Sequence, residues 1–136
     1  MNINGYKQTV LATTDRVQIT LMLYDGALNQ LKMAKIKMQN GDIASKGIHF
    51  TKATNIISEM SNVLDMEKGG EISRNLRNLY EFILRRLLHS NLNNDIKALE
   101  DAEKVVSIIR NSWKEMMTNM KQPQQSEQSV HIQAGI

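Results

Sequence analysis

Apolar residues recur at alternating intervals of three and four along four stretches of this 136-residue chain. This spacing places them on one face of an α-helix, because a helix completes a turn every 3.6 residues. A chain of this length is expected to form one domain, so the four apolar faces must pack against one another. The sequence therefore predicts an all-α fold, an antiparallel up-and-down four-helix bundle with short loops.

Residues that favour helix ends delimit the first two stretches. Asp15 predicts the N-cap of a first helix over residues 16–40, and Gly41 predicts its end, because glycine readily adopts the left-handed conformation found there. Asp42 predicts the N-cap of a second helix over about residues 43–64.

The third and fourth stretches are delimited in the same way. Residues 65–70 are predicted to connect the second helix to a third over residues 71–91, and two consecutive glycines allow this connection to reverse through positive φ. Asn93 or Asn94 predicts the start of the fourth helix, where Asp95 is favourable at the positive end of the helix dipole.

The residues expected to face the core are the apolar members of these repeats. They are Val17, Leu21, Tyr24, Leu28, Leu31 and Met38, then Ile43, Phe50, Ala53, Ile57, Met60 and Leu64, then Ile72, Leu76, Leu79, Ile83 and Leu87, then Ile96, Leu99, Ala102, Val106, Ile109, Trp113, Met116 and Met120. Thr20, Ala27 and Ala34 add a stripe of small residues that permits close packing of the first helix.

The chain is expected to divide into three segments. Residues 1–14 are mostly polar and predict an N-terminal arm, whereas residues 15–120 predict the four-helix bundle. Pro123 lies near the start of residues 121–136, which are rich in glutamine and lack a helical stripe. This last segment is predicted to be a flexible polar tail.

Composition narrows the function classes. The net charge is +3, but the basic residues alternate with acidic and apolar ones along the helices, and aromatic residues make up only 4%. Both features argue against nucleic-acid binding. The absence of cysteine, of a signal segment and of a long apolar run favours a cytosolic protein with no stable membrane insertion.

The sequence offers little support for catalysis. No Glu is followed by His three residues later, as a di-metal site in a helix bundle would require, and neither a nucleophile elbow nor a phosphate-binding loop is found. We therefore expect no catalytic residue, no metal and no cofactor. The alternative is a His-containing phosphotransfer domain, since His49 and Lys52 have the spacing of such a site, although Ala53 stands where that family usually has glycine.

Apolar residues exceed what one core stripe per helix requires. Ile19, Met22 and Leu23 flank the first stripe, and similar residues flank the third and fourth. A four-helix bundle encloses no central helix, so some of this surface should contact another segment. Nine methionines suit an adaptable surface of this kind. The contacting segment is a partner protein, the N-terminal arm or a second subunit in a homodimer.

Two glycine positions are unexpected for a simple bundle. Gly26 lies inside an apolar helical run, where glycine costs about 1 kcal/mol relative to alanine. Gly69 and Gly70 lie between two helical patterns. The same pattern also includes Tyr6, Tyr80, the pair Arg85–Arg86 and the pair Trp113–Lys114. In this order and spacing it resembles the FliS family of flagellar export chaperones, over roughly residues 6–117.

The resemblance implies a function. Members of this family bind the C-terminal segment of flagellin, which is disordered when free, and so block premature polymerisation and help delivery to a component of the flagellar export gate. The residues expected to form the flagellin-binding groove and arm are Tyr6, Val10, Leu11, Met22, Leu23, Tyr24, Asp25, Gly26 and Tyr80. The residues expected to form a structural loop are Asp65, Gly69, Gly70 and Asn75.

The resemblance also implies that Tyr6, Val10 and Leu11 belong to a short arm that lies over the apolar cleft in the absence of flagellin. One departure from the family pattern is found at the start of the first helix. Asp15-Arg16 stands where the family usually has Ser-Pro, and Asp caps a helix as well as Ser does.

Overall fold

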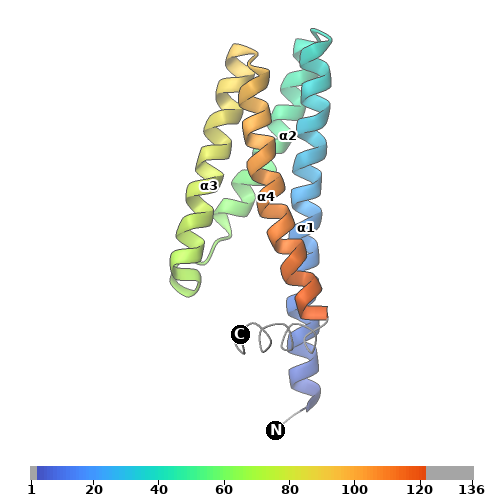
Figure 1. Cartoon of the computed structure of the whole chain (residues 1–136), viewed down its shortest axis with the longest axis vertical. Coiled ribbons are helices and arrows are strands. Elements are labelled where there is room, and N and C mark those ends of the chain that lie inside the picture. Colours follow the sequence, from blue (N-terminus) through green and yellow to red (C-terminus); the bar gives the residue numbers. More distant parts are fainter. Residues whose placement is uncertain (1–2, 122–136) are drawn as a thin grey trace, which may run out of the picture.

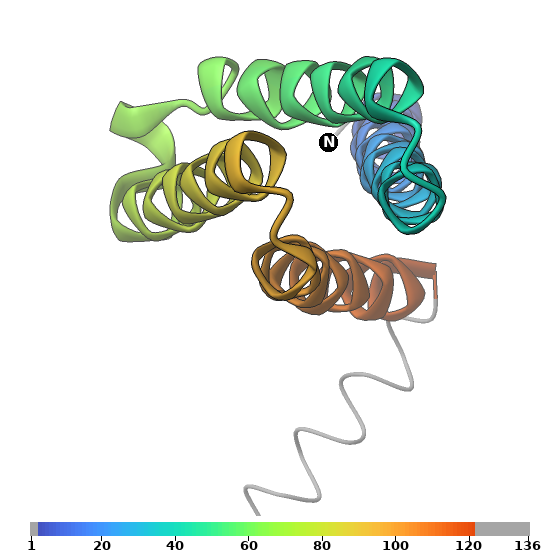
Figure 2. The ribbon, with the colours of Figure 1, turned by 90° about the horizontal axis from the view of Figure 1, so that it is seen from above.

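A computed structural model describes the backbone of residues 3–121 and the side chains of residues 15–119. The chain forms four helices, α1 (Ile3–Gln39), α2 (Ile43–Asn62), α3 (Met66–Asn93) and α4 (Ile96–Lys121). Each helix runs antiparallel to the next, as Figure 1 shows, and contacts exist between neighbours and between α1 and α4. Viewed from above, the four helices form a ring in which α1 and α3 lie on one diagonal (Figure 2). The predicted all-α four-helix bundle is confirmed.

The first helix begins much earlier than predicted. Its backbone is helical from Ile3, so the predicted start at Asp15 is wrong. Figure 1 shows this first part of α1 projecting beyond the other helices rather than lying over the bundle, as the predicted arm would. The physical reason is that no proline interrupts this stretch, and Ile3, Tyr6 and Val10 continue the three-and-four spacing of α1.

The predicted tail lies outside the described residues, except for Lys121 at the end of α4.

The corner between α1 and α2 confirms both predicted helix-end signals. Gly41 has a φ of +73°, its N–H donates to Met38 O, and the next N–H, that of Asp42, donates to Lys37 O. These two bonds form a Schellman motif, which satisfies carbonyls at the end of α1. The Asp42 side chain in turn accepts from Ser45 N and caps α2.

The corner between α3 and α4 also has a left-handed residue followed by an aspartate cap. The fourth helix begins one residue later than predicted. Asn94 adopts the left-handed conformation, with a φ of 51°. Asp95, rather than Asn93 or Asn94, is the N-cap of α4, because its side chain accepts from Ala98 N at 3.2 Å. Asparagine tolerates the left-handed region, which is why it serves here in place of glycine.

The connection between α2 and α3 is partly helical. Residues from Met66 onward are already in α3, but Gly70 interrupts the helix with a φ of 53° and a ψ of −125°. Asp65 caps the first turn by accepting from Glu67 N and Lys68 N. Gly69 has its own constraint, because a Cβ built there would lie 1.6 Å from Ser73 Oγ. The positive φ of Gly70 confirms the prediction that this connection reverses through positive φ at a glycine.

The core consists of the inward faces of all four helices. Its largest fully buried side chains are Tyr24, Leu31, Phe50, Ile57, Ile83, Leu87, Leu99 and Val106. Ala27, Ala34, Ala53 and Ala102 are also fully buried. These small residues let neighbouring helices approach closely, as predicted for the first helix.

Several predicted core residues are exposed instead. Ile43, Ile72, Leu79 and Met116 all lie at the surface. The inward face of α3 is formed partly by hydroxyl-bearing residues, namely Ser73, Tyr80 and Ser90. Each has a partner: Ser73 Oγ donates to Asp65 O at 3.0 Å, Ser90 Oγ donates to Asp95 O at 2.6 Å, and Tyr80 bonds to Tyr24. A buried hydroxyl is tolerated when it is hydrogen-bonded, so these residues replace Ile72 and Leu79 on the inward face.

The Tyr24–Tyr80 bond joins α1 to α3 across the bundle. The two hydroxyl oxygens are 2.5 Å apart, and either can donate. Both side chains are buried, and this burial raises the pKa of each tyrosine above its ordinary value. Both phenols are therefore neutral in the folded protein well above neutral pH.

The glycine at the kink generates the first prediction. Gly70→Ala should lower the free energy of unfolding by about 1–3 kcal/mol, because its backbone angles are strained for any residue with a Cβ. Gly47→Ala is the matched control. It replaces a glycine inside α2 that has open space around it, so it should raise stability by about 0.5–1 kcal/mol. Urea unfolding followed by circular dichroism measures both, and equal midpoints for Gly70→Ala and wild type would contradict the assignment.

The tyrosine pair generates a prediction on alkaline pH. Because the folded pKa of Tyr24 is raised, the unfolded chain ionises first, from about pH 10. Stability contributed by this group is therefore fully present below about pH 10 and is lost as the pH rises above that value. Tyr24→Phe should be less stable by about 1–3 kcal/mol at pH 7, since it leaves Tyr80 unpaired, but it should lose less stability between pH 9 and about 11. Parallel pH slopes in urea unfolding of the two proteins would refute this account.

Candidate binding surface

Thirteen large apolar side chains are exposed among the residues with described side chains. They are Ile19, Met22, Leu23, Ile36, Ile43, Ile48, Val63, Ile72, Leu79, Leu88, Leu92, Ile108 and Met116. Single exposed apolar residues are ordinary, so the informative feature is where several of them lie near one another or beside a cleft.

The first group lies on α1. Ile19, Met22 and Leu23 are exposed, and Met22 keeps 66% of its surface accessible. The adjacent Leu21 and Tyr24 are buried in the core. This part of α1 is therefore apolar on both its inner and its outer face, as the sequence predicted. An apolar outer face of this kind suits contact with another polypeptide.

The second feature is a cleft of about 390 Å³ between α2 and α3. Its α3 side is formed by Leu84, Leu87 and the exposed Leu88, and Phe50 of α2 contributes to the lining. The remaining lining residues are Thr51, Thr54, Asn55, Ser58 and Asn91. No lining residue is charged, so the cleft offers an aliphatic wall opposite a neutral wall of hydroxyl and amide groups.

The third group lies on the facing sides of α3 and α4. Arg86 Nη2 donates to Asp101 Oδ2 at 3.2 Å, which shows where these two helices face each other. Leu79 lies two turns before Arg86, and Ile108 lies two turns after Asp101, so both continue the facing sides toward the other end. Both are exposed. Of the pair Arg85–Arg86, Arg85 is thus at the surface and Arg86 is in a partly exposed ion pair.

The predicted groove residues separate into two sets. Met22 and Leu23 are exposed on α1, whereas Tyr24 and Tyr80 are buried in the core and cannot contact a partner without opening the bundle. Asp25 is exposed, and its carboxylate accepts from Arg110 Nε at 2.8 Å, which ties α1 to α4. The structure therefore places only part of the predicted groove at the surface.

Gly26 lies beside α2. A Cβ built at this position would be 3.7 Å from Ile56 Cδ1, an ordinary contact distance. Packing within the chain therefore does not require a glycine here, and the structure offers no internal reason for it.

The predicted arm residues belong to α1. Tyr6, Val10 and Leu11 lie on its N-terminal part, and their side chains are outside the described residues. Of the predicted loop residues, Asp65, Gly69 and Gly70 form the capped and kinked connection described above. Asn75 is exposed on α3, beyond that connection.

Sequence reasoning missed two parts of this surface. Ile72 and Leu79 were expected in the core, and the hydroxyl and amide wall of the α2–α3 cleft was not anticipated. A signal for the wall exists, since Thr51, Thr54 and Ser58 recur at helical spacing, but polar residues at this spacing also occur on any solvated helix face.

The described residues offer no constellation typical of catalysis or metal binding. No three His, Asp or Glu side chains among them form a group that could hold a metal ion. His49, the residue of the phosphotransfer alternative, is partly buried, and its Nδ1 lies 2.7 Å from Gln30 Oε1. Within the same part of the chain, none of the helices is both long and apolar enough to cross a membrane.

Comparison with known proteins gives a consistent result. Residues 1–120 match the family described as flagellar protein FliS. The chain is 44% identical over 100 residues to the flagellar secretion chaperone FliS of Salmonella typhimurium, covering 73% of this chain and 74% of the relative. It is 38% identical over 114 residues to that of Escherichia coli, covering 83% of each protein, and 32% identical over 111 residues to that of Bacillus subtilis, covering 82% of each.

The family match includes all four helices up to residue 120, and the similarity to these relatives extends over most of the bundle on which the exposed apolar groups lie. On this evidence, the chain belongs to the FliS family of flagellar proteins.

Proposed function

We propose that this protein is a cytosolic, non-enzymatic chaperone that binds flagellin, prevents its premature polymerisation and aids its export by the flagellar type III system. The observation that carries the proposal is the family match over residues 1–120, together with relatives named flagellar secretion chaperones. The phosphotransfer alternative gains no support, because His49 is partly buried against Gln30.

The bound segment is proposed to be the C-terminal segment of flagellin. An amphipathic helix docks through apolar anchors spaced at i, i+3, i+4 and i+7, and the exposed groups on α1, in the α2–α3 cleft and between α3 and α4 offer complementary contacts. These groups lie on different sides of the bundle, so a segment that folds on binding would have to wrap around it. Ordering such a segment costs several kcal/mol, which favours firm but releasable binding.

Two further parts of the proposal concern other partners. Delivery of flagellin to a component of the export gate is supported by the word secretion in the names of the relatives. A homodimer through exposed apolar residues of α1 would use the surface that we assign to flagellin, so flagellin is expected to compete with self-association.

Calorimetry with the isolated C-terminal segment of flagellin tests the function. We expect one-to-one binding with a clearly negative heat-capacity change, because apolar surface is buried. Binding should depend weakly on salt, since the cleft lining carries no charge. No detectable binding at tens of micromolar, a range worth roughly 6–7 kcal/mol, would sink the proposal.

Substitutions test the location of the site. Met22→Glu and Leu88→Glu each place a charge at an exposed apolar position, 66% and 61% accessible respectively, so each variant should fold normally. Each should weaken flagellin binding by tenfold or more, which corresponds to about 1.4 kcal/mol. Ile48→Glu is the matched control, since Ile48 is exposed on α2 outside the three groups and the cleft, and its affinity should stay unchanged. Equal affinities for all three variants would place the site elsewhere.

A further inference from the structure

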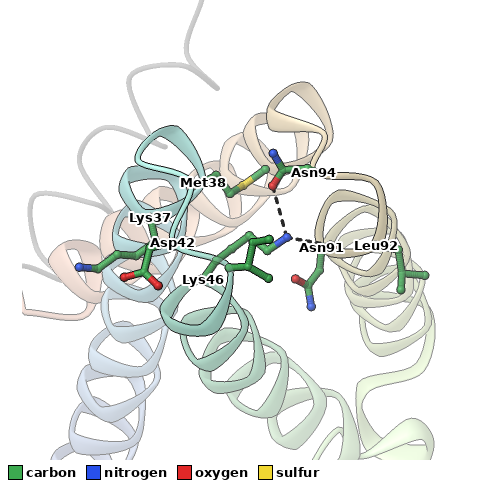
Figure 3. Close-up of a pocket in the computed structure, with 9 residues that line it drawn as sticks. Lys37, Met38, Asp42, Lys46, Asn91, Leu92 and Asn94 are labelled. Carbon is green, nitrogen blue, oxygen red and sulfur yellow. Dashed lines mark hydrogen bonds between the residues drawn. The ribbon is translucent and has the colours of Figure 1, made fainter.

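A second pocket lies at the end of the bundle where the α1–α2 and α3–α4 corners meet. Its volume is about 420 Å³, and Figure 3 shows residues of both corners around it. None of its lining residues belongs to the α2–α3 cleft except Asn91, and none belongs to the exposed group on α1. It therefore shares only Asn91 with the surfaces to which we assign flagellin.

The pocket contains a buried lysine. Lys46 of α2 is only 6% exposed, whereas lysine is almost never fully buried without a partner of opposite charge. Its Nζ donates to Asn91 O at 3.0 Å and to Asn94 Oδ1 at 3.3 Å, as the dashed lines in Figure 3 show. Both acceptors are neutral. An ammonium group has three donors, so these two bonds leave one N–H available.

No carboxylate among the described side chains forms an ion pair with Lys46. Asp42 lines the same pocket, but it caps α2, and in Figure 3 its carboxylate lies away from the Lys46 ammonium. Lys37 also lines the pocket, but in Figure 3 its ammonium points away from that of Lys46. The carbonyl end of α3 offsets part of the cost of burying Lys46, but it supplies no full negative charge.

The same pocket has apolar walls. Ile43 and Leu92 both line it, and they are 75% and 74% exposed, the two highest values among the large apolar residues with described side chains. Met38 contributes a third apolar side chain. An unneutralised cation in a pocket that exposed aliphatic residues also line is complementary to a carboxylate that has aliphatic neighbours.

We propose that this pocket binds a carboxylate of a polypeptide partner, flanked by aliphatic side chains, with Lys46 as the charge partner and Ile43 and Leu92 as the apolar contacts. The single charge of Lys46 and its one available N–H match a carboxylate, whereas a phosphate carries more charge and more acceptor oxygens. Aliphatic walls favour a peptide over a free anion. The proposal does not rest on flagellin binding, because Lys46, Ile43 and Leu92 neither line the α2–α3 cleft nor belong to the exposed group on α1.

Titration of the full chain with short peptides, followed by amide and lysine NMR shifts, tests this site. The first pair of probes is acetyl-Ala-Leu-Glu-Leu-Ala-amide and its Gln counterpart. The second pair is acetyl-Ala-Leu-Leu with a free terminal carboxylate and the same peptide as an amide. At least one carboxylate peptide should bind tenfold or more tightly than its neutral counterpart, with shifts at Lys46 and Asn94. The pair that shows this difference identifies a side-chain or a terminal carboxylate as the natural group.

Variants separate binding from folding. Lys46→Met should abolish the preference for the carboxylate, but it also removes the bonds to Asn91 and Asn94 at the end of α3, which lowers the stability of the bundle. The double variant Ile43→Ser with Leu92→Ser changes only exposed side chains, so it should fold normally and weaken binding at least fivefold. Ile48→Ser, outside the pocket, should bind as wild type does.

Four outcomes would overturn the proposal, and the first three concern binding that is observed. These three are equal binding of carboxylate and neutral peptides, unchanged binding by the Ile43 and Leu92 double variant, and binding of inorganic phosphate as strong as that of the peptides. The absence of any shift up to about 10 mM peptide would also overturn it, because the binding free energy would then be weaker than roughly 3 kcal/mol. Met22→Glu is the final control, because it should weaken flagellin binding and leave these titrations unchanged.

Discussion

The hydroxyl pair of Tyr24 and Tyr80 links the two helices that the bundle otherwise keeps apart. Contacts between neighbouring helices close the ring, but α1 and α3 lie on its diagonal and meet through these side chains. Two large aromatic side chains fill the centre, and each hydroxyl provides the other with the partner that a buried polar group requires. The distance between α1 and α3 therefore depends on this pair. Because Tyr24 and Tyr80 face inward, the neighbouring apolar residues Leu23 and Leu79 face outward.

The inner face of α1 packs in the core, and Met22 and Leu23 lie exposed on its outer side. On α3, hydroxyl-bearing residues occupy inward positions, which leaves Ile72 and Leu79 exposed. A bundle that buried every apolar side chain would have no surface for a helical partner. On α3, the inward orientation of the hydroxyl-bearing residues both places polar groups in the core and leaves apolar side chains at the surface.

The two corners at one end of the bundle are built alike. Each has one residue in the left-handed conformation, Gly41 or Asn94, followed by an aspartate that caps the next helix. Lys46 bonds to Asn91 and Asn94 of the second corner, so it connects α2 to the end of α3. The pocket that contains Lys46 lies between these two corners. It is therefore at the end of the bundle, whereas the surfaces that we assign to flagellin lie along the helices.

Local chemistry in the sequence was enough to determine the helical class, the number of helices, the cap at Asp42 and the resemblance to the FliS family, because these depend on spacing and on residues near one another in the chain. The start of α1 could not be read in this way, since Asp15 is a plausible cap that a continuous helix can also accommodate. Which apolar residues are buried was decided only by the tertiary structure. Ser73, Tyr80 and Ser90 face inward because Asp65, Tyr24 and Asp95 provide their hydrogen bonds, and the Tyr80 partner comes from a distant helix that sequence spacing alone cannot place.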